Sequence, residues 1–131
     1  MFRVLKNKKG VTLVELLAVV VILGIIAAIA VPTIGGLINR QKERAAEATY
    51  DAIVEASKLY AQDVTGRFTL NDLEGDDFID LKTNVFGLGS AVEVEKTAIY
   101  VEVSGNSVSF FAAASGGTAV DLWINGYNVE D

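Results

Sequence analysis

Glu15 is the residue whose chemistry most needs an explanation, because it is the only charged side chain between Val11 and Ile38. A carboxylate in hydrocarbon is unfavourable, so a charge kept there marks a functional site and requires a partner. We therefore expect Glu15 to pair with a cation whose identity decides what the chain does. The alternative is that Glu15 reaches the cytoplasmic membrane surface, since it lies near the start of the run.

The only cluster of acidic residues lies between positions 72 and 80. It comprises Asp72, Glu74, Asp76, Asp77 and Asp80. Calcium binds several carboxylates in a flexible loop, but this spacing lacks the glycine and the terminal glutamate of an EF-hand loop. We therefore expect a solvated acidic loop and no metal site, with a calcium site as the alternative.

Enzyme chemistry has little support in the sequence. The chain contains no His and no Cys, which removes the usual zinc, thiol and disulfide chemistry. It also lacks a phosphate-binding glycine loop followed by Lys, and paired carboxylates alone supply no nucleophile with its base. We expect no catalytic residue, no cofactor and no enzymatic activity.

The charge of the 131-residue chain is unevenly distributed, with a net value of −6. Without its first ten residues, 7 basic and 17 acidic side chains would remain, a net charge of −10. Such a chain is not attracted to nucleic acid over its general surface. Tyr100, Trp123 and Tyr127 have no interleaved Lys or Arg, so we interpret them as sheet-packing residues and expect no direct nucleic acid binding.

The apolar run from Val11 to Ile38 predicts a membrane-spanning helix. Its 28 residues would form a helix of about 42 Å, against about 30 Å for the hydrocarbon core. The basic residues before the run and the acidic region after it predict an amino end inside and a carboxyl end outside. A cleaved secretory signal has a shorter apolar core followed by a small-residue cleavage site, and this run has neither. An ordinary single-span anchor is the simpler alternative.

A short basic band, Arg40, Lys42 and Arg44, follows the apolar run. We interpret it as a topological signal or a headgroup contact, and as poor support for DNA binding.

The start of the apolar run carries a more specific pattern, Lys8-Lys9-Gly10-Val11-Thr12-Leu13-Val14-Glu15. It resembles the amino terminus of type IV prepilins and of the related type II secretion and competence pseudopilins. The resemblance implies leader cleavage between Gly10 and Val11 on the cytoplasmic face, followed by N-methylation of Val11.

The resemblance also implies which residues serve assembly: Thr12, Glu15, Gly24 and Pro32. Cleavage would free the α-amino group of Val11, cationic at neutral pH, one helical turn before Glu15. The family's role for this Glu is to pair with the amine of an adjacent subunit and set the axial register. Pro32 removes one backbone hydrogen bond, so we expect a kink or local loosening there. The resemblance implies that the stretch from Gly24 to Pro32 unwinds in a filament, and a harmless kink is the alternative.

The chain after the apolar run predicts a continued helix. Residues 39–65 contain no Gly or Pro, and small and apolar residues recur at helical spacing. We predict one helix from Thr12 to Thr65, ended by Gly66, whose second half packs an Ala-rich face on a sheet. That face comprises Ala45, Ala46, Thr49, Ala52, Ile53, Ala56, Leu59 and Tyr60.

The remainder predicts a loop over 68–90 and then strands around 92–95, 99–104, 108–113 and 120–124. Ser104-Gly105-Asn106-Ser107 predicts a hairpin turn, and Asn125-Gly126 predicts a tight turn into 127–129. The expected fold is α+β, a long N-terminal helix packed on a small antiparallel meander of three or four strands. Without a disulfide, the 119–129 region must be held by hydrogen bonds and by Trp123 and Tyr127.

Four segments are therefore expected: a prepilin leader (1–10), a hydrophobic transmembrane and assembly helix (11–38), an amphipathic half (39–66), and a loop and β-sheet head (67–131). The resemblance implies a structural subunit of a type IV pilus-like surface filament. It would begin in the cytoplasmic membrane and end in the filament, with other copies, other pilins, a prepilin peptidase/methylase and an assembly platform protein as partners. The alternatives are a competence or type II secretion pseudopilin serving DNA uptake or protein export, and a plain anchored domain that never polymerises.

Overall fold

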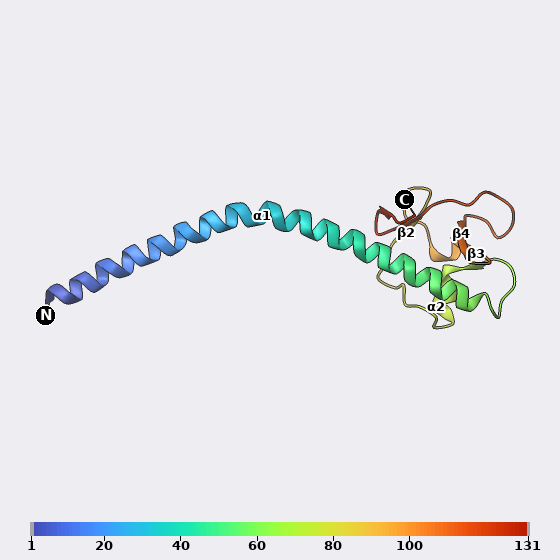
Figure 1. Cartoon of the computed structure of the whole chain (residues 1–131), viewed down its shortest axis with the longest axis horizontal. Coiled ribbons are helices and arrows are strands. Elements are labelled where there is room, and N and C mark those ends of the chain that lie inside the picture. Colours follow the sequence, from blue (N-terminus) through green and yellow to red (C-terminus); the bar gives the residue numbers. More distant parts are fainter. Residues whose placement is uncertain (1, 131) are drawn as a thin grey trace. The chain divides into compact units, whose positions relative to one another are not determined.

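We describe the fold from a computed structural model, which covers the backbone of residues 2–130 and the side chains of residues 12–130. In chain order the elements are α1 (Phe2–Tyr60), β1 (Phe68–Thr69), α2 (Leu70–Gly75), β2 (Phe86–Leu88), the 3₁₀ helix η1 (Lys96–Ala98), β3 (Tyr100–Ser104), β4 (Ser107–Phe111), β5 (Leu122–Ile124) and β6 (Tyr127–Asn128) (Figure 1). The chain divides into two compact units, Met1–Gln41 and Lys42–Asp131, and we call the second unit the head. The predicted α+β class is confirmed.

In the first unit α1 is a continuous apolar helix. The described side chains of residues 12–41 are exposed, apart from the partly buried Ala30. The helix assignment of α1 continues through Pro32 without a break. Thr33 Oγ1 donates a hydrogen bond to the carbonyl of Ile29 (3.1 Å).

In the head, one line along α1 faces the core. Ala46, Ile53 and Ser57 are fully buried, and Tyr50 and Tyr60 are half-buried beside them. These positions recur every three or four residues and so lie on one side of the helix.

The predicted Ala-rich face was partly wrong. Ala45 and Ala52 are exposed, and Leu59 exposes 55% of its surface. Each of these residues precedes a core-facing residue by one position, which rotates it by about 100° around the helix. The small sheets cover only one line of the helix, so these neighbours remain in solvent.

The helix α1 ends at Tyr60, earlier than the predicted Thr65. The Tyr60 ring packs against Phe68, with ring centroids 4.7 Å apart, and edge-on against Phe78 at 5.2 Å. The chain must therefore reverse soon after Tyr60 to bring Phe68 back to it. Gly66, with φ +93°, supplies the left-handed residue in that reversal.

The helix α2 was missed, because residues 68–90 predicted a loop. Thr69 Oγ1 accepts a hydrogen bond from the backbone N–H of Asp72 (3.1 Å), and the Asp72 carboxylate accepts one from the N–H of Thr69 (2.8 Å). This reciprocal capping box fixes the helix start, and Leu70 and Leu73 are fully buried. Six residues are too few to show helical periodicity, so the Thr-x-x-Asp spacing was the only sequence signal.

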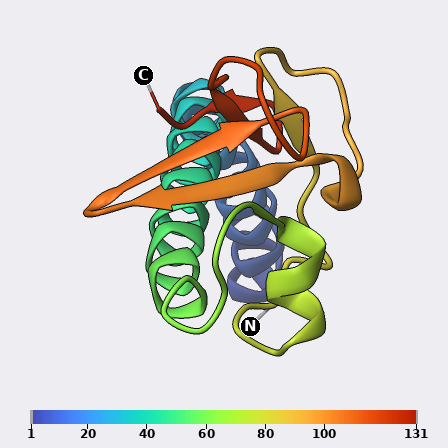
Figure 2. The ribbon, with the colours of Figure 1, turned by 90° about the vertical axis from the view of Figure 1, so that its right-hand side faces the viewer.

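The first sheet has the order β1-β3-β4 and is antiparallel. Its β3–β4 hairpin pairs Ser104 with Ser107 across the predicted turn, where Gly105 adopts φ +61°. In Figure 2 the hairpin, in orange, lies across α1. The ring contact between Tyr50 and Phe110, with centroids 6.0 Å apart, joins the two elements.

The second sheet has the order β2-β5-β6 and is also antiparallel. Asn125 (φ +51°) and Gly126 (φ +85°) adopt the left-handed conformations that a type I′ turn requires, as Asn-Gly predicted. The prediction of a single meander of three or four strands was wrong, since the head contains two three-stranded sheets. The strand predicted at 92–95 is reduced to one bridge, between Val94 and Phe86. Local alternation could not reveal that β2 pairs with the distant β5.

Both sheets, α2 and the head part of α1 share one apolar core. Fully buried side chains come from each of them: Ile53 of α1, Leu73 of α2, Phe110 of β4 and Leu122 of β5. Each such side chain contributes about 1.5–3 kcal/mol on burial. The head is thus held together by packing, in a chain without Cys.

Candidate assembly segment

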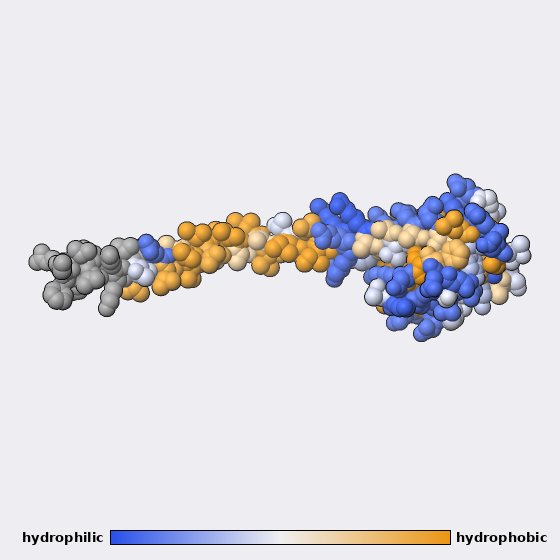
Figure 3. Space-filling view, turned by 90° about the horizontal axis from the view of Figure 1, so that it is seen from below, coloured by the Kyte–Doolittle hydropathy of each residue, from blue (hydrophilic) through white to orange (hydrophobic). Residues whose placement is uncertain are grey.

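The described part of the apolar run, residues 12–38, carries exposed apolar side chains at most of its positions, and the face of it drawn in Figure 3 is mostly hydrophobic. Its Leu, Ile and Val residues keep 45–70% of their surface exposed. A continuous apolar surface of this extent marks a membrane or protein contact. By length and composition, α1 is the one helix in the described part of the chain that could cross a membrane.

Glu15 lies on α1 one turn after Thr12. Its side chain is exposed, and none of the ion pairs found within residues 12–130 involves it. A cation for Glu15 must therefore come from outside this range or from another molecule.

The glycines of the segment have no packing role within one chain. A Cβ atom built on Gly24, Gly35 or Gly36 would meet nothing within 4 Å. A glycine in a helix interior makes the helix less stable than an alanine does, by about 0.5–1 kcal/mol. The remaining physical reasons for glycine here are backbone adaptability and the close approach of another helix.

The predicted processing site, Gly10 and Val11, lies within α1 but outside the residues whose side chains the structure describes. Its assignment rests on the sequence.

Comparison with known families decides the identity of this segment. Residues 5–31 match the prokaryotic N-terminal methylation motif. This motif is the signature of the prepilin-type segment of type IV pilins and pseudopilins, so residues 5–31 form a pilin-like N-terminal segment. The match includes Gly10, Val11 and Glu15 and ends one residue before Pro32. Comparison with curated proteins and with solved structures found no match.

The pilin-type motif also indicates the class of protein and how such a chain is processed. It points to a structural protein, to processing by a prepilin peptidase and to pilus assembly. The exposed apolar helix fits membrane anchoring before assembly.

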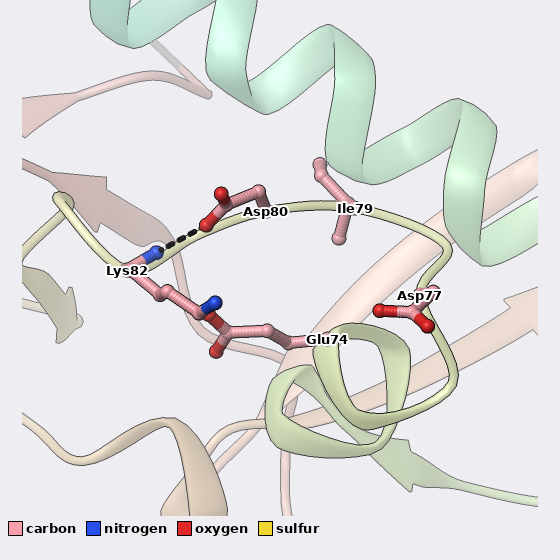
Figure 4. Close-up of a pocket in the computed structure, with 5 residues that line it drawn as sticks. All are labelled: Glu74, Asp77, Ile79, Asp80 and Lys82. Carbon is pink, nitrogen blue, oxygen red and sulfur yellow. Dashed lines mark hydrogen bonds between the residues drawn. The ribbon is translucent and has the colours of Figure 1, made fainter.

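The acidic residues beside α2 border a small pocket (Figure 4). Its lining residues are Glu74, Asp77, Ile79, Asp80 and Lys82. Asp80 Oδ1 accepts a hydrogen bond from the backbone N–H of Lys82 (3.1 Å), and Glu74 forms an ion pair with Lys96. Within the described chain, no group of three or more acidic, His or Cys side chains is placed to hold a metal ion. The geometry gives a calcium site no support.

Arg67 holds the loop after β4, a role that sequence reasoning missed. Its Nε donates to Glu102 Oε2 (2.7 Å), and its Nη1 donates to the carbonyls of Ala113 (2.9 Å) and Gly116 (2.7 Å). The guanidinium also lies 3.4 Å from the centre of the Phe111 ring, in a cation–π contact. A single Arg in a turn carries no sequence signal for contacts this distant.

Glu130 closes the C-terminal region, and it too was missed. Its Oε2 accepts a hydrogen bond from the Leu122 N–H (2.7 Å), and its Oε1 accepts one from the Tyr50 hydroxyl (3.2 Å). Burial raises the pKa of Glu130, while the bond from Leu122 opposes that shift. Burial and the nearby Glu130 charge raise the pKa of Tyr50 to about 12. Trp123 and Tyr127, expected to close this region, are half-buried in β5 and β6.

Proposed function

We propose that the chain is the precursor of a structural subunit of a type IV pilus-like surface filament. The leader, residues 1–10, is removed after Gly10, the Val11 amine is N-methylated, and mature copies polymerise through the apolar helix. The observation that carries the proposal is the methylation motif leading into a helix whose described apolar side chains are exposed. Such a helix leaves a membrane only for another apolar environment, which the packed helices of other copies supply.

Before assembly, the helix of residues 11–38 spans the cytoplasmic membrane with the C-terminus outside. The four basic side chains before Val11 support this orientation. Residues 39–66 then form the amphipathic half of the helix, and residues 67–131 form the loop and β-sheet region. The partners are other copies, other pilins, the prepilin peptidase/methylase and the assembly platform protein.

In the filament, Glu15 pairs with the methylated Val11 amine of an adjacent subunit. Glu15 has no cation within the described residues, and cleavage after Gly10 creates one at the mature amino terminus. A buried carboxylate left without its cation is strongly unfavourable, so this pairing favours assembly in register. Thr12, Gly24 and Pro32 belong to the same assembly segment.

The test is Glu15→Ala in the full chain, produced in cells that carry the assembly machinery. Leader removal should continue, and filament yield in sheared surface material should fall sharply. Glu43→Ala, which removes an exposed carboxylate from the same helix, is the matched control and should leave yield unchanged. Normal filament yield from Glu15→Ala would contradict the pairing.

The alternative role is a competence or type II secretion pseudopilin, which would use the same anchor. Electron microscopy of sheared material, probed for this chain, separates the two. Long filaments support the pilus subunit, and short or absent filaments support the pseudopilin.

A further inference from the structure

The charge of the head is the starting point for an inference about how copies meet. Residues 42–131 hold 6 basic and 16 acidic side chains, a net charge of −10. Three of the basic residues form ion pairs within the head: Lys58 with Glu55, Arg67 with Glu102, and Lys96 with Glu74. Heads this acidic repel one another when packed side by side, so any unused cation matters.

Lys42 is such a cation. Its side chain is exposed, and no ion pair within residues 12–130 involves it. It lies one turn before Ala46, on the line of α1 that faces the core, at the first residue of the head. Arg44 is also exposed but lies about 200° further around the helix, on the opposite side.

The other end of the same side of α1 carries an excess of negative charge, although the exposed Lys82 lines a pocket together with Asp77 and Asp80. Tyr60 contacts Phe78, and the exposed residues Asp76, Asp77 and Asp80 lie on either side of Phe78 in the chain. Asp76 interacts with the Tyr60 hydroxyl, and this hydrogen bond raises the pKa of Tyr60. Asp77 has no hydrogen bond or ion pair to another side chain in the described chain. We call residues 76–80 the acidic loop.

Lys42 and the acidic loop cannot meet within one copy. Lys42 and Tyr60 are 18 residues apart on α1, which is about 27 Å and five full turns, so they mark opposite ends of one side of the head. Two complementary patches that do not overlap make a heterologous contact between copies. Repeated heterologous contacts build rings or open helical filaments, whereas a closed dimer uses one patch twice.

We propose that Lys42 of one copy binds the acidic loop of a second copy, so that heads stack base to top along the assembly. The inference rests on the proposed filament and deepens it by naming a contact between heads. The charge complementarity of an unpartnered cation and an unpartnered carboxylate at opposite ends of the same unit carries it.

Zero-length crosslinking tests the contact directly in the unaltered chain. A carbodiimide adds to a carboxyl group and forms an O-acylisourea. The lysine amine attacks its carbonyl carbon, an amide forms, and the carbodiimide leaves as a urea that has taken up the elements of water. The treatment is applied to membranes and to sheared surface material, and linked peptides are identified by mass spectrometry. We expect a link between Lys42 and the acidic loop, and the ion pair of Lys96 with Glu74 provides an internal positive control.

The outcomes separate this inference from the filament proposal. Filaments without the Lys42 link, but with the Lys96–Glu74 link, overturn the contact and leave the filament standing. The Lys42 link in membranes of cells without filaments supports the contact and overturns the filament. If neither the Lys42 link nor filaments are found, both the contact and the filament proposal are overturned. Lys42→Arg keeps the charge but removes the reactive amine, so it should lose the link and keep assembly.

Charge exchange gives a second, independent readout. Lys42→Glu should lower filament yield about tenfold, because it places like charges together at every head contact. Adding Asp77→Lys, at the carboxylate that has no hydrogen bond or ion pair within the described residues, should restore most of that yield. Arg44→Glu makes the same charge change on the opposite side of the helix and should have little effect. An equal loss in Arg44→Glu, or no recovery in the exchanged pair, overturns the contact.

Discussion

The hydroxyl of Tyr50 donates a hydrogen bond to the carboxylate of Glu130 at 3.2 Å, and so joins the helix of the head to the end of the chain. The second carboxylate oxygen accepts from the Leu122 N–H at 2.7 Å, which ties the same residue to β5. A side chain 80 positions away along the sequence thus holds the C-terminal hairpin against α1. In a chain without Cys, this contact closes the region without a covalent bond.

We predict that Tyr50→Phe lowers the free energy of unfolding of the head by about 0.5–1.5 kcal/mol, the usual contribution of one hydrogen bond. The ring contact with Phe110 should remain. The measurement is urea unfolding of the full chain in detergent, followed by the fluorescence of Trp123, the only Trp. Tyr127→Phe removes a half-buried hydroxyl from the same hairpin and should change little. Equal effects of both variants would contradict the role of Glu130.

Glu130 should also give the head a specific pH dependence. Burial raises its pKa above the ordinary value of 4.5, so the folded head holds this proton more tightly than the unfolded chain. The stabilisation is therefore complete below pH 4.5 and is lost as pH rises through the folded pKa. Glu130→Gln removes the titration. The unfolding free energy of the native chain minus that of the variant should therefore fall between acid and neutral pH. A difference that does not change with pH would contradict the raised pKa of Glu130.

Gly10→Val should block leader removal, because the proposed cleavage site requires Gly before Val11. Intact-mass measurement of the membrane-bound chain should then show the full precursor without an added methyl group. Gly24→Ala lies in open space on the same helix and should be processed normally. A mature, methylated product from Gly10→Val would place the cleavage elsewhere.

Gly87→Ala should destabilise the second sheet. A Cβ at this position overlaps the carbonyl oxygen of Ser90 and lies 2.8 Å from that of Val92, so backbone must move. Overpacking of this kind typically costs about 1–3 kcal/mol. Urea unfolding followed by Trp123 fluorescence measures it, since Trp123 pairs with Gly87 in the β2–β5 ladder. Gly75→Ala, where a Cβ meets nothing, is the control.

Much of the local structure was predictable because it depends on neighbouring residues. The apolar run determined a long exposed helix, and Ser104–Ser107 and Asn125-Gly126 determined two hairpin turns. The signature around Gly10 and Glu15 was predictable for the same reason, since motif and spacing lie within one helical segment, and the methylation motif at residues 5–31 confirms it.

The contacts that the sequence left open join residues far apart in the chain. The pairing of β2 with β5, the end of α1 at Tyr60, the Arg67 contacts and the Glu130 carboxylate all depend on which surfaces meet when the core closes. Periodicity says which side of a helix is apolar, but only packing decides which line of it is covered, as Ala45 and Ala46 show. Local residues are enough to predict an apolar helix that carries one carboxylate and follows a methylation motif. How the head closes without a disulfide, and that Lys42 and the acidic loop lie at opposite ends of one side, depends on contacts between distant residues.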